Sequence, residues 1–161
     1  MKARVKATTK KGVKEMKFNS QICTTREQSE RLLALGLKKE TADMLIWIDN
    51  RATEARNTSY ITQDYFLPYY REHLIRDGSL FIPAWSLHRL IEMMPKSIYH
   101  KNLCCFLFIA SSVYVQYRID LYGASQTIEE QFMKGNLWDN IINCIEWLIK
   151  EGYFNKEYLE R

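Results

Sequence analysis

Apolar residues recur at helical spacing near the C-terminus, and this band is the clearest periodic signal in the chain. Asn136, followed three residues later by Asp139, supplies a polar start, and Gly152 supplies a stop. The pattern predicts an amphipathic helix over residues 137–151. Its apolar band consists of Trp138, Ile141, Ile142, Ile145, Leu148 and Ile149.

A second helix is predicted between two prolines. Pro83 fixes its own backbone and biases Ile82 towards extended geometry, and Pro95 cannot continue a helix. Ser86 fits as an N-cap. We therefore expect a helix over residues 84–94 that packs on a sheet. The apolar residues of its buried face are Leu87, Leu90, Ile91 and Met94.

The third predicted helix follows from its capping residues. Residues 24–28 read as a capping box, because a threonine side chain can accept from the amide three residues on while Glu27 or Gln28 reaches back. Gly36 favours a positive φ, and the leucine after it can fold back on the last turn. These signals predict a helix over residues 25–35.

Three stretches have the length and pattern of strands. Residues 44–48 form a short apolar run between acidic residues. Residues 103–109 are apolar on both faces, so we expect a central strand that is covered on two sides. Residues 113–121 alternate, which predicts a hairpin with one apolar face and one wet face. Residues 123–127 read as a break after this strand.

These elements predict an α+β fold, in which a small antiparallel sheet of about three or more strands is packed by the three helices. Residues 50–59 are polar and loop-like, and residues 60–80 give no decisive pattern. The chain has 161 residues, of which 47% are hydrophobic and 26% charged, as is usual for one globular domain. The longest apolar-rich run, residues 103–115, is too short to span a membrane.

Charge separates the N-terminal segment from the rest. The net charge is +4, but residues 1–17 hold seven basic residues and one acidic residue, a balance of +6 that leaves −2 for residues 18–161. We therefore expect a basic leader over 1–17 and one domain over 18–161. Met16 is an alternative start of translation, which would remove most of the leader. Only the leader favours nucleic acid or anionic lipid by charge.

Candidate chemistry is sparse. The cysteines Cys23, Cys104, Cys105 and Cys144 lack metal-type spacing, and we interpret them as reduced, buried thiols of a cytoplasmic protein. The three histidines do not form a metal motif. No residue is assigned a catalytic, cofactor-binding or metal-binding role, and no membrane partner is expected.

The strongest binding signal is an aromatic and basic mixture over residues 60–76, which could stack bases or form a protein hot spot, or could pack within the domain. Trp85 is a second candidate anchor, or a lid over the core. His88 lies on the polar face of its helix. The candidate partner-binding residues are Tyr65, Tyr69, Tyr70, Arg71, Trp85 and His88.

Two segments resemble a family of small uncharacterised proteins of Bacteroidetes genomes and their phages and mobile elements. Residues 23–44 carry the EQS, LLALGL and TADM strings, and residues 82–95 carry IPAWSL and a closing MP. The resemblance spans about residues 22–152. It implies a bacterial cytoplasm and an association with phage or mobile elements, and it implies no activity, cofactor or catalytic residue.

The expected function is therefore binding of another protein rather than catalysis. The main alternative is a nucleic-acid accessory protein that uses the basic leader and residues 60–76. A weaker alternative is an enzyme whose site is assembled across the fold without a local motif.

Overall fold

The computed structural model of this protein describes residues 21–48, 58–62, 80–110, 114–121, 124–127, 132 and 135–160. Short 3-10 helices occur at Lys39–Thr41 and Lys156–Tyr158. The helices and strands are, in chain order, α1 (Arg26–Ala34), β1 (Met44–Ile48), β2 (Thr58–Thr62), β3 (Leu80–Ala84), α3 (Leu87–Met93), β4 (Ser97–His100), β5 (Leu103–Ala110), β6 (Tyr114–Leu121), β7 (Ala124–Thr127) and α4 (Leu137–Lys150).

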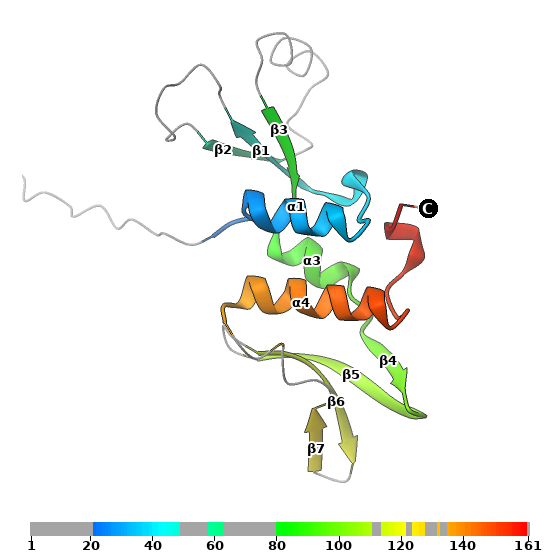
Figure 1. Ribbon diagram of the computed structural model, residues 1–161. Helices are drawn as coiled ribbons and strands as arrows, with labels where there is room; N and C mark the ends of the chain where they lie inside the picture. The colour runs from blue at the N-terminus through cyan, green and yellow to red at the C-terminus, as the bar shows by residue number, and fades with distance from the viewer. Residues whose placement is uncertain are drawn as a thin grey trace, which may run out of the picture.

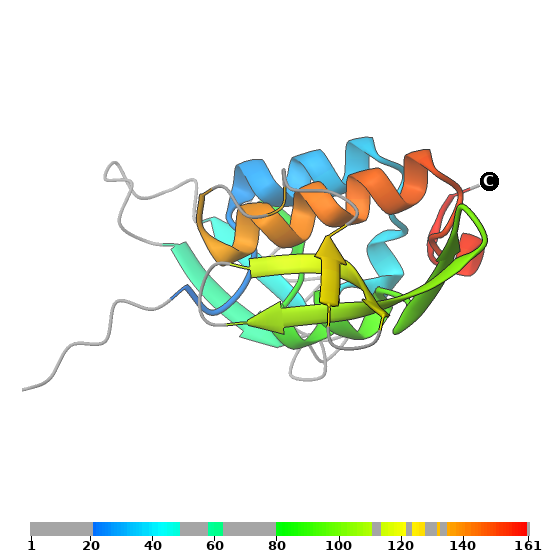
Figure 2. The same ribbon diagram turned by 90° about the horizontal axis from the view of Figure 1, so that it is seen from below.

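The helices lie between two antiparallel sheets (Figure 1). The first sheet has the order β2-β1-β3 and the second has the order β4-β5-β6-β7. Helix α4 contacts β6, α1 contacts β3, and α1 and α4 run side by side (Figure 2). The predicted α+β class and the three helices are confirmed, whereas the predicted strands are divided between two sheets instead of sharing one.

The first sheet includes Ala84, which the sequence placed at the start of a helix. In the β1–β3 ladder Pro83 pairs with Leu45 and Ala84 pairs with Met44, and α3 begins only at Leu87. A proline is tolerated here because β3 is an edge strand, on which half of the amide groups point away from β1. The helix predicted over 84–94 is therefore shorter, and its first residue belongs to a strand.

Helix α1 has both of its predicted caps. The Thr25 hydroxyl accepts from the Gln28 amide at 3.3 Å, and the Gln28 side chain accepts from the Thr25 amide at 3.0 Å. At the other end Gly36 has a φ of +88°, and the Leu37 amide donates to the Leu32 carbonyl at 3.2 Å. This is the Schellman geometry, so the prediction over 25–35 is confirmed to within one residue at each end.

Helix α4 is the central element of the larger core. The Asn136 side chain accepts from the Asp139 amide at 2.9 Å, and the Tyr153 amide donates to the Leu148 carbonyl at 2.8 Å just after Gly152. These contacts confirm the predicted helix over 137–151. Its buried residues are Trp138, Asn140, Ile141, Ile142, Cys144, Ile145, Trp147 and Leu148.

Replacing the α4 cap, Asn136→Ala, is expected to lower the free energy of unfolding by about 1 kcal/mol, because the Asp139 amide loses its acceptor. The matched control is Asn136→Ser, which keeps a capping oxygen and should stay within about 0.5 kcal/mol of the parent chain. Urea denaturation followed by far-UV circular dichroism measures both. Equal losses for the two changes would contradict a capping role.

The second sheet is a meander of four strands. The β4–β5 turn has positive φ at both central residues, 49° at Lys101 and 65° at Asn102, as a type I′ hairpin requires. β7 pairs with the end of β6, from Leu121 opposite Ala124 to Arg118 opposite Thr127. The sequence analysis did not predict β4, and it interpreted the β7 region as a break. Both strands are short and lack apolar alternation, and they form because they pair with β5 and β6.

Candidate functional site

Strand β5 has one face towards the core and one face towards solvent. Cys105 is 0% exposed, whereas its neighbour Phe106 is 54% exposed and Phe108 is 40% exposed. The prediction that 103–109 is covered on both sides was therefore wrong. Its physical reason is that, among the described elements, the helices pack on the face carrying Cys105 (Figure 1), and an apolar sequence alone does not specify a second covering layer.

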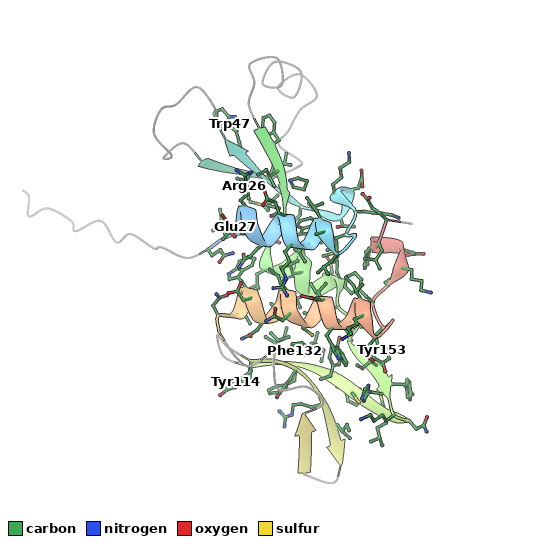
Figure 3. All side chains as sticks on the ribbon, in the orientation of Figure 1. Arg26, Glu27, Trp47, Tyr114, Phe132 and Tyr153 are labelled. Carbon is green, nitrogen blue, oxygen red and sulfur yellow. The ribbon has the colours of Figure 1, made fainter. Side chains whose placement is uncertain are left out.

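Strand pairing places further aromatic side chains on the same side as Phe106 and Phe108, because residues paired across a ladder point to one face. Tyr99 on β4 and Tyr114 on β6 each pair with a β5 residue two positions from one of these phenylalanines. Tyr99 is 73% exposed, and Tyr114, which is labelled in Figure 3, is 42% exposed. Together with Arg118 these residues form what we call the aromatic face: Tyr99, Phe106, Phe108, Tyr114 and Arg118.

Arg118 connects the two phenylalanines of this surface. It is paired with Phe106 across the β5–β6 ladder, and its guanidinium carbon lies 4.3 Å from the centroid of the Phe108 ring. A cation–π contact of this kind contributes about 0.5–1 kcal/mol at an exposed site. The arginine thus holds a planar cationic group against the aromatic surface.

The inner side of the same strands is anchored to α4 by aromatic packing. Tyr117 is 1% exposed and its hydroxyl donates to the Pro95 carbonyl at 2.5 Å. The Trp147 ring of α4 lies 6.2 Å from the Tyr117 ring and 5.7 Å from the Phe132 ring, between centroids, and Phe132 lies between α4 and the sheet (Figure 3). Burial raises the pKa of Tyr117, so its hydroxyl stays a donor. The aromatic face therefore has a packed, fixed support.

The segment that carries the aromatic face is basic. The charged residues of 96–121 are Lys96, Lys101, Arg118 and Asp120, a net charge of +2, in contrast to −2 for residues 18–161. Lys96 and Lys101 are exposed, the latter in the β4–β5 turn. One acidic residue, Asp120, lies on β6 within this segment, so the basic excess is small.

The residues that the sequence singled out for partner binding do not lie on this surface. Trp85 is 0% exposed and its side chain belongs to the core, so of its two readings the structure supports the core residue and not the partner anchor. His88 is exposed on α3 rather than on the second sheet. The remaining candidates fall outside the described residues: Tyr65, Tyr69, Tyr70 and Arg71.

Trp85 joins three parts of the fold by hydrogen bonds. Its indole N–H donates to the Thr41 hydroxyl at 3.0 Å, and its backbone amide donates to the Thr24 hydroxyl at 3.0 Å. Its carbonyl accepts from the Thr24 amide at 2.9 Å. Next to it, Asp43 accepts from the amide of Ser86 at 2.8 Å and from its hydroxyl. This network is structural, since it ties the start of α1 and the approach to β1 to the start of α3.

The alternation of residues 113–121 indicates an exposed face, but only the pairing of the strands shows that Tyr99, Phe106 and Phe108 lie on it. Residues 113–121 were expected to have a wet face, on which the alternation places Tyr114, Gln116, Arg118 and Asp120. Gln116 is buried instead, at 8% exposure. In the observed hairpin these residues pair with even-numbered positions of β5, so both phenylalanines share that wet face. The register, not the composition, identifies the surface.

The cysteines are not placed for nucleophilic chemistry. Cys23, Cys105 and Cys144 are buried, whereas Cys104 is half-buried, so the expectation of buried thiols holds for three of the four. Burial, with a smaller contribution from Asp43, raises the pKa of Cys23 to about 11, and burial raises that of Cys144 to about 12. These thiols are protonated at neutral pH and are poor nucleophiles. Within the described ranges no group of three or more His, Cys, Asp or Glu could hold a metal ion.

In the part of the chain that the structure describes, no helix has the length and apolar character needed to cross a membrane. Comparison with protein-family models, with curated proteins and with solved structures finds no match to this chain.

Proposed function

We propose that this protein acts by binding another macromolecule, and that its binding surface is the aromatic face of the second sheet. The observation that carries the proposal is the exposure of four aromatic side chains on one side of adjacent strands: Tyr99, Phe106, Phe108 and Tyr114. Large exposed aromatic side chains gathered on one side of a sheet are typical of an interaction site.

The composition of this surface supports a binding role. Tyrosine, phenylalanine and arginine are the residue types enriched in binding interfaces, because each presents a large contact area with few rotatable bonds. The strands beneath them are fixed to α4 by the Tyr117 and Trp147 packing. A surface supported in this way loses little conformational entropy when a partner binds.

The setting of this function is proposed from the sequence resemblance. A bacterial cytoplasm and an association with phage or mobile elements fit a small binding protein. The three buried cysteines fit a reducing compartment, because none of the four cysteines is paired in a disulfide.

Site-directed photo-crosslinking in the native host tests the proposal. A benzophenone amino acid in place of Tyr99, which is 73% exposed, is expected to trap a discrete partner. The same amino acid in place of the exposed His88 on α3 is the matched control and should not trap it.

The changes Phe106→Ser and Phe108→Ser are then added to the variant that carries the benzophenone amino acid in place of Tyr99. They should remove the cross-linked species. The two changes should cost on the order of 1 kcal/mol of stability each, because only about half of each side chain is buried. Urea denaturation checks that the fold is retained. The proposal fails if position 99 traps nothing, or if the species persists when both phenylalanines are replaced.

A further inference from the structure

We infer that the free edge of strand β4 accepts an extended, acidic segment of a partner protein as an added strand. The inference rests on the proposed function, because Tyr99 belongs both to β4 and to the aromatic face. Three properties of β4 carry it, namely the direction of its backbone groups, its support by the core and the charges at its two ends.

Strand β4 offers backbone groups to a partner because it is the last strand of its sheet. Within the described residues the second sheet has the order β4-β5-β6-β7, so β4 has a neighbouring strand on one side only (Figure 1). The Leu107 amide donates to the Lys96 carbonyl at 2.9 Å, so the backbone groups of Lys96 point towards β5. Because the direction alternates along an antiparallel strand, the amides and carbonyls of Ser97 and Tyr99 point away from β5. These groups can form a ladder with an added strand.

The edge of the first sheet formed by β3 is less suited to an added strand. Pro83 lies within β3 and has no amide hydrogen to donate. Just after β3, the Trp85 carbonyl already accepts from the Thr24 amide at 2.9 Å. Strand β4 contains no proline, so both of its outward residues keep their amide donors.

The core holds β4 in an extended conformation from its inner side. Ile98 is 4% exposed, and the His100 Nδ1 atom lies 3.1 Å from the Tyr153 hydroxyl oxygen. Just before the strand, the Pro95 carbonyl accepts from the Tyr117 hydroxyl at 2.5 Å. A strand that is fixed before binding loses little conformational entropy when a partner pairs with it.

The charges at the ends of β4 indicate which kind of segment pairs with it. Lys96 precedes the strand and Lys101 follows it; both are exposed, and no other charged residue occurs in the sequence 95–110. Arg118 and Asp120 lie on β6, which is separated from β4 by β5, and their charges offset each other. An extended segment with acidic residues at both ends therefore complements β4.

The same features disfavour two other occupants of this edge. In an antiparallel pair of two β4 strands, Lys96 of each copy would lie close to Lys101 of the other, and like charges across a ladder are destabilising. A nucleic acid has no peptide groups that continue the ladder, so it would leave the outward groups of Ser97 and Tyr99 without their strand partners.

Titration of the isotopically labelled full chain with a synthetic peptide, followed by NMR, tests the inference. The peptide has about eight residues, which span β4 and extend past both ends, with acidic residues at each end and alternating valine and threonine between them. The amide signals of Ser97 and Tyr99 should move and their hydrogen exchange should slow, because these donors become bonded. The amides of Ile98 and His100 already face β5, so their signals should change less.

A proline substitution tests the backbone ladder. Ser97→Pro removes one outward donor and should raise the Kd of the peptide about 10-fold, the effect of one lost hydrogen bond. A proline is tolerated at an edge position whose amide faces solvent, and urea denaturation checks that the fold is retained. The matched control is Ser97→Ala, which keeps the amide and should bind like the parent chain.

A charge reversal tests the selection of an acidic segment and does not depend on the proline variant. Lys96→Glu combined with Lys101→Asp should weaken binding of the acidic peptide at least about 10-fold. The same protein should bind a peptide that carries lysines in place of the acidic residues. Aspartate is chosen at position 101 because φ there is 49°, a conformation that aspartate adopts more readily than most residues.

The outcomes distinguish this inference from the proposed function. The inference is overturned if the acidic peptide moves no β4 signal at low salt, if folded Ser97→Pro binds like the parent chain, or if the charge-reversed protein still prefers the acidic peptide. It is also overturned if the species trapped at position 99 is a second copy of this chain or is removed by nuclease. In each case the proposed function stands if position 99 traps a partner that depends on the two phenylalanines; if nothing is trapped, the proposed function fails.

Discussion

Truncation of Trp85 to alanine is expected to lower the free energy of unfolding by about 3–5 kcal/mol, the range found when a buried large aromatic side chain is removed. The indole is 0% exposed and belongs to the larger core. Its removal leaves a cavity and also leaves the Thr41 hydroxyl without the donor 3.0 Å away. Urea denaturation of the variant and the parent chain measures the difference.

Two controls separate the contributions of Trp85. Trp85→Phe keeps most of the apolar contact and loses the N–H donor, so it should cost clearly less than the alanine change. Tyr99→Ala removes an aromatic side chain that is 73% exposed and should stay within about 0.5 kcal/mol of the parent chain. If Trp85→Ala is as mild as Tyr99→Ala, then Trp85 is a surface residue in solution and its assignment to the core is wrong.

The substitution Ile145→Ala in the middle of α4 is expected to lower the free energy of unfolding by about 2–5 kcal/mol. Its side chain is 0% exposed within the core that joins the helices to the second sheet. The packing there is close, so the cavity can be only partly filled by movement of its neighbours. Urea denaturation of the variant and the parent chain measures the difference in free energy of unfolding.

The matched control for this change lies four residues further along the same helix. Ile149→Ala removes the same atoms from a half-buried position at the margin of the core, and it should cost less than half as much. Helix propensity changes equally in the two variants, so the difference between them reports burial. Similar losses at both positions would show that α4 is not covered as the structure describes.

The helices were predictable because their boundaries are set by local chemistry. The Thr25 and Gln28 capping box, the Asn136 cap and the glycines after α1 and α4 satisfy backbone groups within a few residues of themselves. Such contacts form wherever the segment is helical, so the sequence is sufficient to locate them. The start of α3 was misplaced because Pro83 is compatible both with the first turn of a helix and with an edge strand.

The candidate site was not predictable in the same way. Trp85 is amphipathic, and its position before a helix fits a core residue as well as a surface anchor. Its hydrogen bonds with Thr24 and Thr41, which are distant in the chain, hold it in the core. Phe106 and Phe108 lie in an apolar run that fits a strand covered on both faces. Whether the second face is covered depends on the other elements of the fold.

By itself the sequence determined the helices, the strands of residues 44–48, 103–109 and 113–121, the α+β class and the charge contrast between 1–17 and the remainder. These properties depend on spacing, capping and composition, which act over a few residues. Only the tertiary structure decided that the strands form two sheets with the helices between them, and that Tyr99, Phe106, Phe108 and Tyr114 on one side of β4, β5 and β6 reach solvent. Pairing register and the number of covering layers decide which apolar side chains reach solvent, because burial results from contacts between segments that are distant in the chain.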